Sequence, residues 1–285
     1  MTSVVIAAHN EAAVLPGCLH RLLDGAGPDE FEVLVVANGC TDDTAEVARS
    51  VPGVRVLELA EASKSAALNA GDDAATRFPR IYLDADINLS ATGARTLAAA
   101  VVGSPPGPAG GLLAAAPGRR LDTTGRPLPV RAYYAINSRL PAFRDALFGR
   151  GAIVLSAAGR ARFDRFPDQI ADDLFLDSLF EIGEKREVGQ VTTVIATPRL
   201  TRDLLRRLGR VRTGNTAMRA TDTRVRRARR ASWLVDVVLP RPWLLPAGIC
   251  YAVLTIAAGI SARRNRQQTW GRDESSRTPA EGASR

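Results

Sequence analysis

The chain has 285 residues, of which 46% are hydrophobic and 24% charged, enough to bury a sizeable core in one large domain with appendages. Its three cysteines are scattered without CxxC spacing, which argues against both a disulfide framework and a zinc ribbon. The formal net charge of +8 is unevenly placed, because residues 199–230 are rich in arginine and need an anionic partner or a solvated face.

The first third of the chain alternates short apolar runs with segments of helical period. The apolar runs cover residues 3–8, 31–37, 54–59 and 80–84, and the helical segments cover 12–23, 41–50 and 63–76. This alternation predicts an α/β fold with a Rossmann-like, mostly parallel sheet flanked by helices on both faces. Asn10, Thr41 and Ser63 are of the residue types that cap helix N-termini, so we expect the first three helices to begin there.

The middle third continues the α/β pattern after a break. A helix is predicted over 90–102, and the Gly- and Pro-rich residues 103–111 predict a loop that divides the chain into two halves. Beyond it, the sequence predicts an apolar run, a helix, a strand that enters a helix, and a helix with acids at its start; these cover 112–116, 130–140, 149–156 and 170–180.

The last third contains an apolar segment and a polar tail. Residues 242–262 carry no charge over a length that could cross a hydrocarbon core, and arginines flank both ends. Three interpretations stay open: a spanning helix, a re-entrant or interfacial hairpin, and a helix buried in the protein or against a partner. The tail over 267–285 is predicted to be disordered. No secretory signal precedes the first strand, so we expect a cytoplasmic protein, at the inner face of the plasma membrane if 233–262 associates with lipid.

A pair of carboxylates follows the fourth predicted strand. Asp84 and Asp86 are spaced i, i+2 at its end, where two oxygen ligands can hold a divalent cation. Oxygen ligands suit Mg²⁺ or Mn²⁺, and a chain with only two histidines is a poor candidate for zinc. The alternative is that both are ordinary turn acids.

Polar residues also follow the other predicted strands. Asn10 and Glu11 come after the first strand and Asn38 after the second, at the sheet edge where ligands bind in open α/β folds. Lys64 opens the third helix, where a cation is unfavourable with the helix dipole and therefore suggests an anionic ligand. The alternatives are a tight turn at Asn38 and a solvated lysine.

Two adjacent acids open the helix predicted over 170–180. Asp172 and Asp173 would be stabilised there by the helix dipole, so a capping role is one interpretation. The other is that one of them is a general base that removes a proton from a hydroxyl.

Taken in order, these motifs resemble family 2 glycosyltransferases, the inverting enzymes of GT-A fold, over residues 3–215. The stretches that carry the resemblance are VVIAAHNEA, VVANGCTDDT, KSAALNAG, LDAD, GRGAIVLSAAGRARF and ADDLFL. Two positions depart from the common pattern. Asn38 stands where many members have an aspartate that reads uracil, and Asp172 stands where glutamate is usual.

The resemblance assigns roles to individual residues. It implies that Asp173 is the catalytic base with Asp172 beside it, and that Asp84 and Asp86 form the metal- and nucleotide-contacting pair. It also implies that Arg212, in a run similar to one on a later helix of the family, contacts the donor diphosphate. The donor-binding set would then comprise Asn10, Glu11, Asn38, Lys64, Asp84 and Arg212.

The resemblance implies a GT-A domain over 1–220, with a nucleotide-sugar half over 1–102 and an acceptor and catalytic half over 111–220. A basic and apolar helical segment over 221–266 would follow. The implied activity is transfer of a sugar from a nucleotide-diphosphate donor to an acceptor hydroxyl, with lipid-linked acceptors of the cell envelope among the options and no nucleic acid expected. The alternatives are a catalytically silent sugar-nucleotide-binding relative and a nucleic-acid-binding protein that uses residues 199–230.

Overall fold

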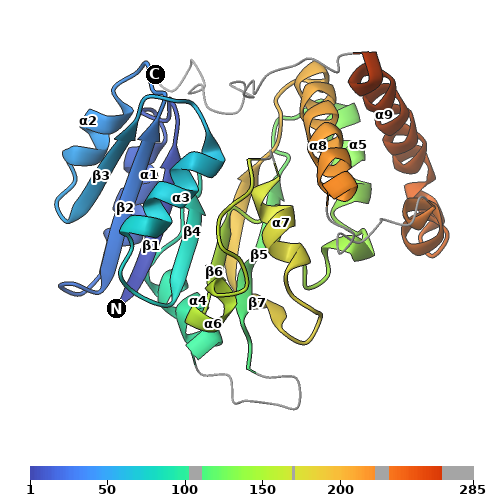
Figure 1. The fold of residues 1–285 in the computed structure, drawn as a ribbon. Helices are drawn as coiled ribbons and strands as arrows, with labels where there is room; N and C mark the ends of the chain where they lie inside the picture. Colours follow the sequence, from blue (N-terminus) through green and yellow to red (C-terminus); the bar gives the residue numbers. More distant parts are fainter. Residues whose placement is uncertain (103–110, 169–170, 222–230, 265–285) are drawn as a thin grey trace. The chain divides into compact units, whose positions relative to one another are not determined.

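The structure is a computed structural model that describes residues 1–102, 111–168, 171–221 and 231–264 (Figure 1). The predicted loop over 103–110, the end of the arginine-rich stretch over 222–230 and the predicted disordered tail over 267–285 lie outside the described residues. The chain divides into two compact units. Unit 1 comprises Met1–Arg120 and Asp145–Ile195, and unit 2 comprises Leu121–Arg144 and Ala196–Arg285.

A seven-stranded sheet, counted over the described residues, has the order β3-β2-β1-β4-β6-β5-β7. The four strands predicted from the sequence form its parallel part, and β6 runs antiparallel to both β4 and β5. The sheet is therefore mixed, with the parallel strands predicted correctly. The strands are β1 (Thr2–Ala8), β2 (Phe31–Asn38), β3 (Val54–Leu59), β4 (Arg80–Asp84), β5 (Ala114–Asp122), β6 (Ala152–Leu155) and β7 (Lys185–Ala196).

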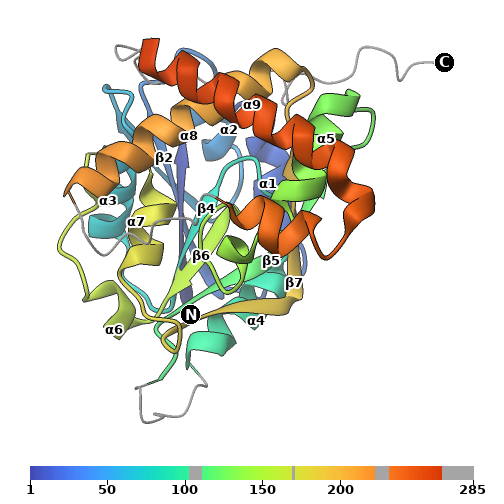
Figure 2. The same cartoon turned by 90° about the vertical axis from the view of Figure 1, so that its right-hand side faces the viewer.

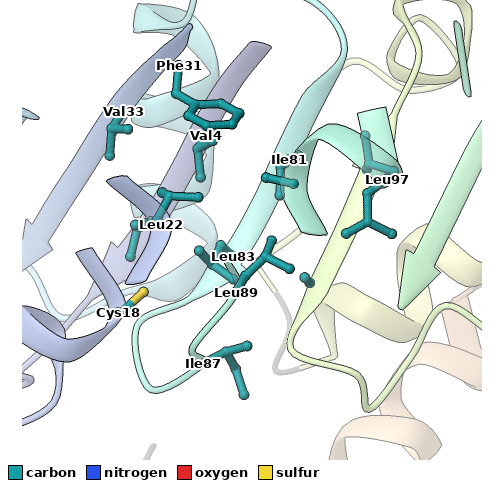
Figure 3. Packing of buried hydrophobic residues seen from close by; sticks show 14 of the residues in the cluster. Val4, Cys18, Leu22, Phe31, Val33, Ile81, Leu83, Ile87, Leu89 and Leu97 are labelled. Atoms are coloured by element: carbon teal, nitrogen blue, oxygen red, sulfur yellow. The ribbon is translucent and has the colours of Figure 1, made fainter. Parts of the chain in front are cut away.

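Helices cover both faces of this sheet in unit 1. Successive side chains of a strand point to opposite faces, so a strand that is apolar throughout needs a packing partner on each face. On one face Val4 packs in a cluster with Leu22 of α1 (Leu15–Leu23) and Leu97 of α4 (Ala91–Val102) (Figure 3). On the other face Val5 packs in a cluster with Leu68 of α3 (Lys64–Ala74) and Leu176 of α7 (Asp172–Ser178). These three layers confirm the predicted α/β architecture.

The predicted helix starts are correct only at Ser63, whose Oγ accepts a hydrogen bond from the Ala66 N–H at 3.2 Å and caps α3. The predictions for Asn10 and Thr41 are wrong. Helix α1 begins at Leu15, and α2 (Thr44–Arg49) begins after Asp43. The side chain of Asn10 instead accepts a hydrogen bond from the Thr41 N–H at 2.7 Å, which joins the loops that follow β1 and β2.

Unit 2 is built from helices with their own apolar contacts. Helix α9 (Leu245–Arg264) packs against α5 (Leu128–Asn137) and α8 (Thr201–Thr221) (Figure 2). Tyr133 of α5 stacks on Tyr251 of α9 with ring centroids 4.9 Å apart. Shorter helical segments are η1 (Pro141–Phe143), η2 (Trp233–Val238) and η3 (Pro242–Leu244), and unit 1 adds α6 (Ala157–Arg160). Among the described residues, the helical stretch Pro242–Ser261 is long and apolar enough to cross a membrane.

Candidate active site

The candidate site lies at the carboxyl edge of the parallel strands in unit 1. Asn38 is the last residue of β2, Asp84 is the last residue of β4, and Asn10 follows β1 by two residues. Because β1 pairs in parallel with both β2 and β4, these three strand ends point to one edge of the sheet. The chain therefore brings the predicted donor-site motifs together at the edge where open α/β sheets bind ligands.

Lys64 joins the two groups of predicted acids. Its Nζ lies 2.9 Å from Asp84 Oδ1 at the end of β4 and 3.0 Å from Asp172 Oδ2 at the start of α7. The side chain of Lys64 is about one-third exposed, and that of Asp172 is more enclosed. The Lys64 ammonium thus forms ion pairs with Asp84, a predicted metal ligand, and with Asp172 of the predicted catalytic pair, although the two aspartates are far apart in sequence.

Asp173 has the electrostatics of a base that works near neutral pH. Burial, followed by the negative charge of Asp172, raises the pKa of Asp173 to about 6, although the Gly149 N–H and the Lys64 ammonium act in the opposite direction. Asp173 Oδ2 accepts a hydrogen bond from the Gly149 N–H at 2.8 Å, and Oδ1 accepts one from the Leu174 N–H at 2.8 Å. These two contacts fix the orientation of the carboxylate.

The local charge favours a further cation. Burial disfavours the charge on Lys64, but Asp172 and Asp84 outweigh it and hold the pKa of the ammonium well above its usual value. The Lys64 ammonium therefore contacts the carboxylates of Asp84 and Asp172 and also feels the charge of Asp173. The excess negative charge is a favourable setting for a divalent cation.

The residues present fit a cation that is completed by a ligand. Asp84 is half-buried and Asp86, two residues later, is exposed, so a ligand can reach both residues from solvent. Among the described residues, no group of three or more His, Cys, Asp or Glu side chains is arranged to hold a metal. Mg²⁺ is commonly held by one or two carboxylates together with substrate phosphates, and the Asp84–Asp86 segment matches that donor set.

The predicted base-binding residues connect the loops of the site. Asn38 is 1% exposed, and its amide donates a hydrogen bond to the Ala8 carbonyl at 2.8 Å. The His9 ring nitrogen Nδ1 lies 2.6 Å from the Asn38 carbonyl oxygen. Glu11 is buried, and its backbone N–H donates to Thr44 Oγ1 at 2.8 Å. These contacts hold the loops after β1 and β2 together, and direct contact of these side chains with a nucleotide stays a prediction.

Arg212 is placed in unit 2, on α8. Its guanidinium donates a hydrogen bond to the Thr255 carbonyl of α9. A carbon added to Gly259 of α9 would meet the same guanidinium, so the arginine packs closely against α9. The predicted contact of Arg212 with a diphosphate stays a prediction.

Sequence reasoning missed a turn that contacts both halves of the site. Gly149, with φ 69°, donates to Asp173, and the carbonyl of Gly151, with φ 72°, accepts a hydrogen bond from the Asp84 N–H at 2.9 Å. Both glycines adopt the left-handed conformation that L side chains rarely accept. The available signal was the Gly-Arg-Gly triplet, two glycines around one charged residue directly before an apolar strand.

The chain has the fold of the GT-A glycosyltransferases. It is similar to a mannosyltransferase from Pyrobaculum calidifontis solved with GDP-Man and Mn²⁺, with 22% identity, a TM-score of 0.59, and coverage of 93% of this chain and 79% of that one. It is also similar to glucosyl-3-phosphoglycerate synthase from Mycobacterium tuberculosis, solved with Mn²⁺, UDP and glucosyl-3-phosphoglycerate, with 18% identity, a TM-score of 0.55, and coverage of 79% and 80%.

The sequence locates the family within the chain. Residues 3–102, about a third of the chain, match the family described as Glycosyl transferase family 2. This match confirms the resemblance predicted from the sequence motifs over residues 3–102. No curated protein sequence matches the chain. A second structure of the Mycobacterium tuberculosis synthase, at 17% identity and a TM-score of 0.55, contains Mg²⁺ and UDP.

Proposed function

We propose that the protein is an inverting glycosyltransferase that moves a sugar from a nucleotide-diphosphate donor to an acceptor hydroxyl. The observation that supports this most directly is the position of Lys64 between Asp84 and Asp172. Lys64 contacts both Asp84 and Asp172, which supports a single site for the donor-side aspartate and the predicted base pair. The family match over 3–102 supports donor binding by the same half of the chain.

In the proposed reaction, Asp173 is the general base. Its carboxylate takes the proton of the acceptor hydroxyl while the hydroxyl oxygen attacks the anomeric carbon of the donor. The new glycosidic bond forms as the bond to the diphosphate oxygen breaks, and the nucleoside diphosphate leaves. Because this is a single displacement, the anomeric configuration inverts. A pKa of about 6 allows Asp173 to be ionised at neutral pH and still retain more basicity than an ordinary aspartate.

Asp84 and Asp86 would hold the divalent cation, Mg²⁺ or Mn²⁺, and similar folds have been solved with both ions. The bound cation would neutralise the charge that develops on the departing diphosphate. Lys64 adds a protein cation at the same place and would balance the phosphate charge once the donor enters. Asp172 favours the charged form of Lys64 and raises the pKa of Asp173. Its role is therefore to tune the basicity of Asp173, and Asp173 itself accepts the proton.

The donor set comprises Asn10, Glu11, Asn38, Lys64, Asp84 and Arg212, as predicted from the sequence. The loops after β1 and β2 would present the nucleotide-binding surface, because Asn10 is exposed and its side chain is held by the Thr41 N–H. Asn38 would act from beneath this surface, through its contact with the Ala8 carbonyl. The predicted domain bounds, 1–220 for the transferase and 221–266 for the helical segment, belong to the same proposal.

We further propose that α9 lies in a membrane interface and does not cross the bilayer. One face of α9 packs on α5 and α8, and α8 presents the exposed side chains of Arg202 and Arg206. Arginine side chains are costly in the hydrocarbon core, which disfavours a bilayer-spanning position for a helix that packs on α8. Its other face exposes a stripe of apolar residues suited to interfacial binding: Leu245, Ile249, Val253, Ile256 and Ile260. This surface supports a cell-envelope or glycolipid acceptor at the cytoplasmic side of the membrane.

Donor turnover is the direct test. The purified chain is incubated with a panel of UDP- and GDP-sugars, with and without Mn²⁺ or Mg²⁺, and release of nucleoside diphosphate is measured. We expect metal-dependent turnover of one donor in wild type and its loss in Asp173→Asn. Metal-dependent binding without turnover for any acceptor offered would favour the catalytically silent alternative, and absence of metal-dependent binding would reject the proposed site.

A further inference from the structure

The turn formed by residues 149–151 contacts both sides of the candidate site. The Gly149 N–H donates to the carboxylate of Asp173 at 2.8 Å. The Gly151 carbonyl accepts from the backbone N–H of Asp84 at 2.9 Å. A carbon added to Gly151 would collide with the side chain of Ile87, so the turn also packs closely on the residue that follows Asp86. One short turn therefore links the metal-type segment to the predicted base.

The side chain between the two glycines anchors this turn in the core. Arg150 is 1% exposed, and arginines are almost never buried so completely unless their charge is paired. Its guanidinium donates to the Pro117 carbonyl at 2.8 Å, donates to the Ala146 carbonyl, and lies 2.7 Å from Glu187 Oε2. Its backbone carbonyl accepts a hydrogen bond from Thr193 Oγ1 at 2.7 Å. These contacts connect the turn to β5, to the preceding loop and to β7.

We propose that Arg150 is a positioning residue that sets the distance between the Asp84–Asp86 segment and Asp173. This inference rests on the proposed function, because it concerns the alignment of donor and base. Asp84 belongs to a strand that pairs on both sides, whereas Asp173 belongs to a helix of seven residues. The base is thus the less constrained partner, and the contact from Gly149 supplies a constraint that its own helix does not.

The planar guanidinium explains why an arginine occupies this position. It donates in several directions at once, and here it connects two backbone carbonyls and one carboxylate. A lysine could keep the ion pair with Glu187 but could not reproduce the fork. A misplacement of about 1 Å between reacting groups can cost on the order of 100-fold in rate, so loosening this turn should affect the chemical step strongly.

The test compares Arg150→Met and Arg150→Lys with Arg162→Met, a matched control. Arg162 is an exposed arginine of the same unit. It forms an ion pair of 2.5 Å with Glu184 and does not contact residues 149–151 in any hydrogen bond or ion pair described for it. Donor-binding sites are counted by titration with Mn²⁺ and the nucleoside diphosphate, and kcat is expressed per binding site. We expect kcat per site to fall about 10- to 100-fold in Arg150→Met and less in Arg150→Lys. Affinity for the nucleoside diphosphate should change by less than about threefold, and the control should match wild type.

A second variant covers the case in which Arg150→Met does not fold. Thr193→Val removes the hydrogen bond to the Arg150 carbonyl at 2.7 Å together with a longer one to the Gly118 carbonyl at 3.4 Å. We expect a several-fold loss of kcat per site with nucleotide affinity kept. Unchanged kcat per site in the folded variants would overturn the proposal, because a purely structural arginine alters only the number of intact sites.

Hydrogen exchange separates failure of this inference from failure of the proposed function. In the positioning model, Thr193→Val and Arg150→Lys accelerate exchange in the peptides over 145–151 and 171–178 and leave β1 and β2 protected. This holds whether or not the wild type turns over a donor. Acceleration spread evenly over unit 1 would overturn the positioning role, whereas absence of turnover in the wild type would reject only the transferase proposal.

Discussion

Lys64 and Asp172 form an ion pair of 3.0 Å that joins the first residue of α3 to the first residue of α7. A lysine at a helix N-terminus is unfavourable with the helix dipole, whereas an aspartate there is favourable. The Lys64 ammonium also forms an ion pair with a second acid, Asp84, which offsets its unfavourable position at the helix N-terminus. This arrangement is the basis of the first three predictions.

Asp173→Asn should strongly reduce turnover and stabilise the fold. Loss of a general base lowers kcat by about 10²- to 10⁴-fold, and donor affinity should be kept. Because the folded pKa of Asp173 is raised to about 6, the protein loses stability as the carboxyl ionises with rising pH. Wild type and variant should therefore have similar stability below pH ~4, the ordinary aspartate pKa. The variant should be more stable at pH 7–8 by up to about 3 kcal/mol in denaturant unfolding.

The pH dependence of wild-type activity should follow the ionisation of Asp173. The logarithm of kcat/KM should rise with pH through about 6 and then level, because only ionised Asp173 accepts the proton. A profile that stays flat from pH 5 to 8 would exclude Asp173 as the titrating base.

Lys64→Gln should shift this acidic limb to higher pH. The ammonium lowers the pKa of Asp173, so its removal leaves the effects of burial and of Asp172 unopposed. Affinity for the nucleotide donor should fall as well, because the site loses its protein cation. The pH dependence of kcat/KM and the donor dissociation constant are measured on the same preparation. An unchanged limb together with unchanged affinity would show that Lys64 is only a surface ion pair.

Asp86→Ala should weaken the dependence on the divalent cation. We expect at least tenfold more Mn²⁺ for half-maximal donor binding, because one of two carboxylate ligands is removed. Asp73→Ala is the matched control, since Asp73 is an exposed acid that pairs with Arg165 in the same unit. Binding of Mn²⁺ with the nucleoside diphosphate is followed by calorimetry, and equal Mn²⁺ requirements in the two variants would contradict the assignment.

Adjacent aspartates in α3 should differ sharply in their effect on stability. Asp72 is buried, pairs with Arg80 and Arg160, and accepts a hydrogen bond from the Tyr82 hydroxyl at 2.6 Å. Asp72→Asn leaves the buried Arg80 without its charge partner and should cost about 3–5 kcal/mol in the free energy of unfolding. Asp73→Asn, one residue later and exposed, should change it by less than about 0.5 kcal/mol. Urea unfolding of both variants measures the contrast.

The exposed stripe of α9 should bind lipid. Val253→Glu and Ile256→Glu place charges on that stripe and should reduce co-sedimentation with vesicles that contain anionic lipid. Val102→Glu, at an exposed apolar residue of α4 in unit 1, is the control and should leave vesicle binding unchanged. Equal binding by all three variants would remove the membrane proposal. Loss of all binding in high salt would assign it to the arginines alone.

The sequence predicted the parallel part of the sheet because its evidence is local. Each of the strands β1 to β4 is a short apolar run, and the helices between them repeat apolar residues at helical spacing. The antiparallel strand β6 was predicted as a strand, but its direction in the sheet depends on pairing with β4, which no local pattern encodes. Two helix starts were wrong because Asn10 and Thr41 bond to each other and cap no helix.

By itself, the sequence determined which residues are candidates for the site, because carboxylates after strands and acids at a helix start are visible as residue types at set positions. Only the tertiary structure decided that Lys64 bridges Asp84 and Asp172, and that the turn around Arg150 holds the Asp84 segment and Asp173 together. These contacts join residues that are distant in the chain, and burial beside other charges sets the pKa of Asp173. Distance and burial are properties of the folded chain, so they arise only when β4, β6 and α7 have packed.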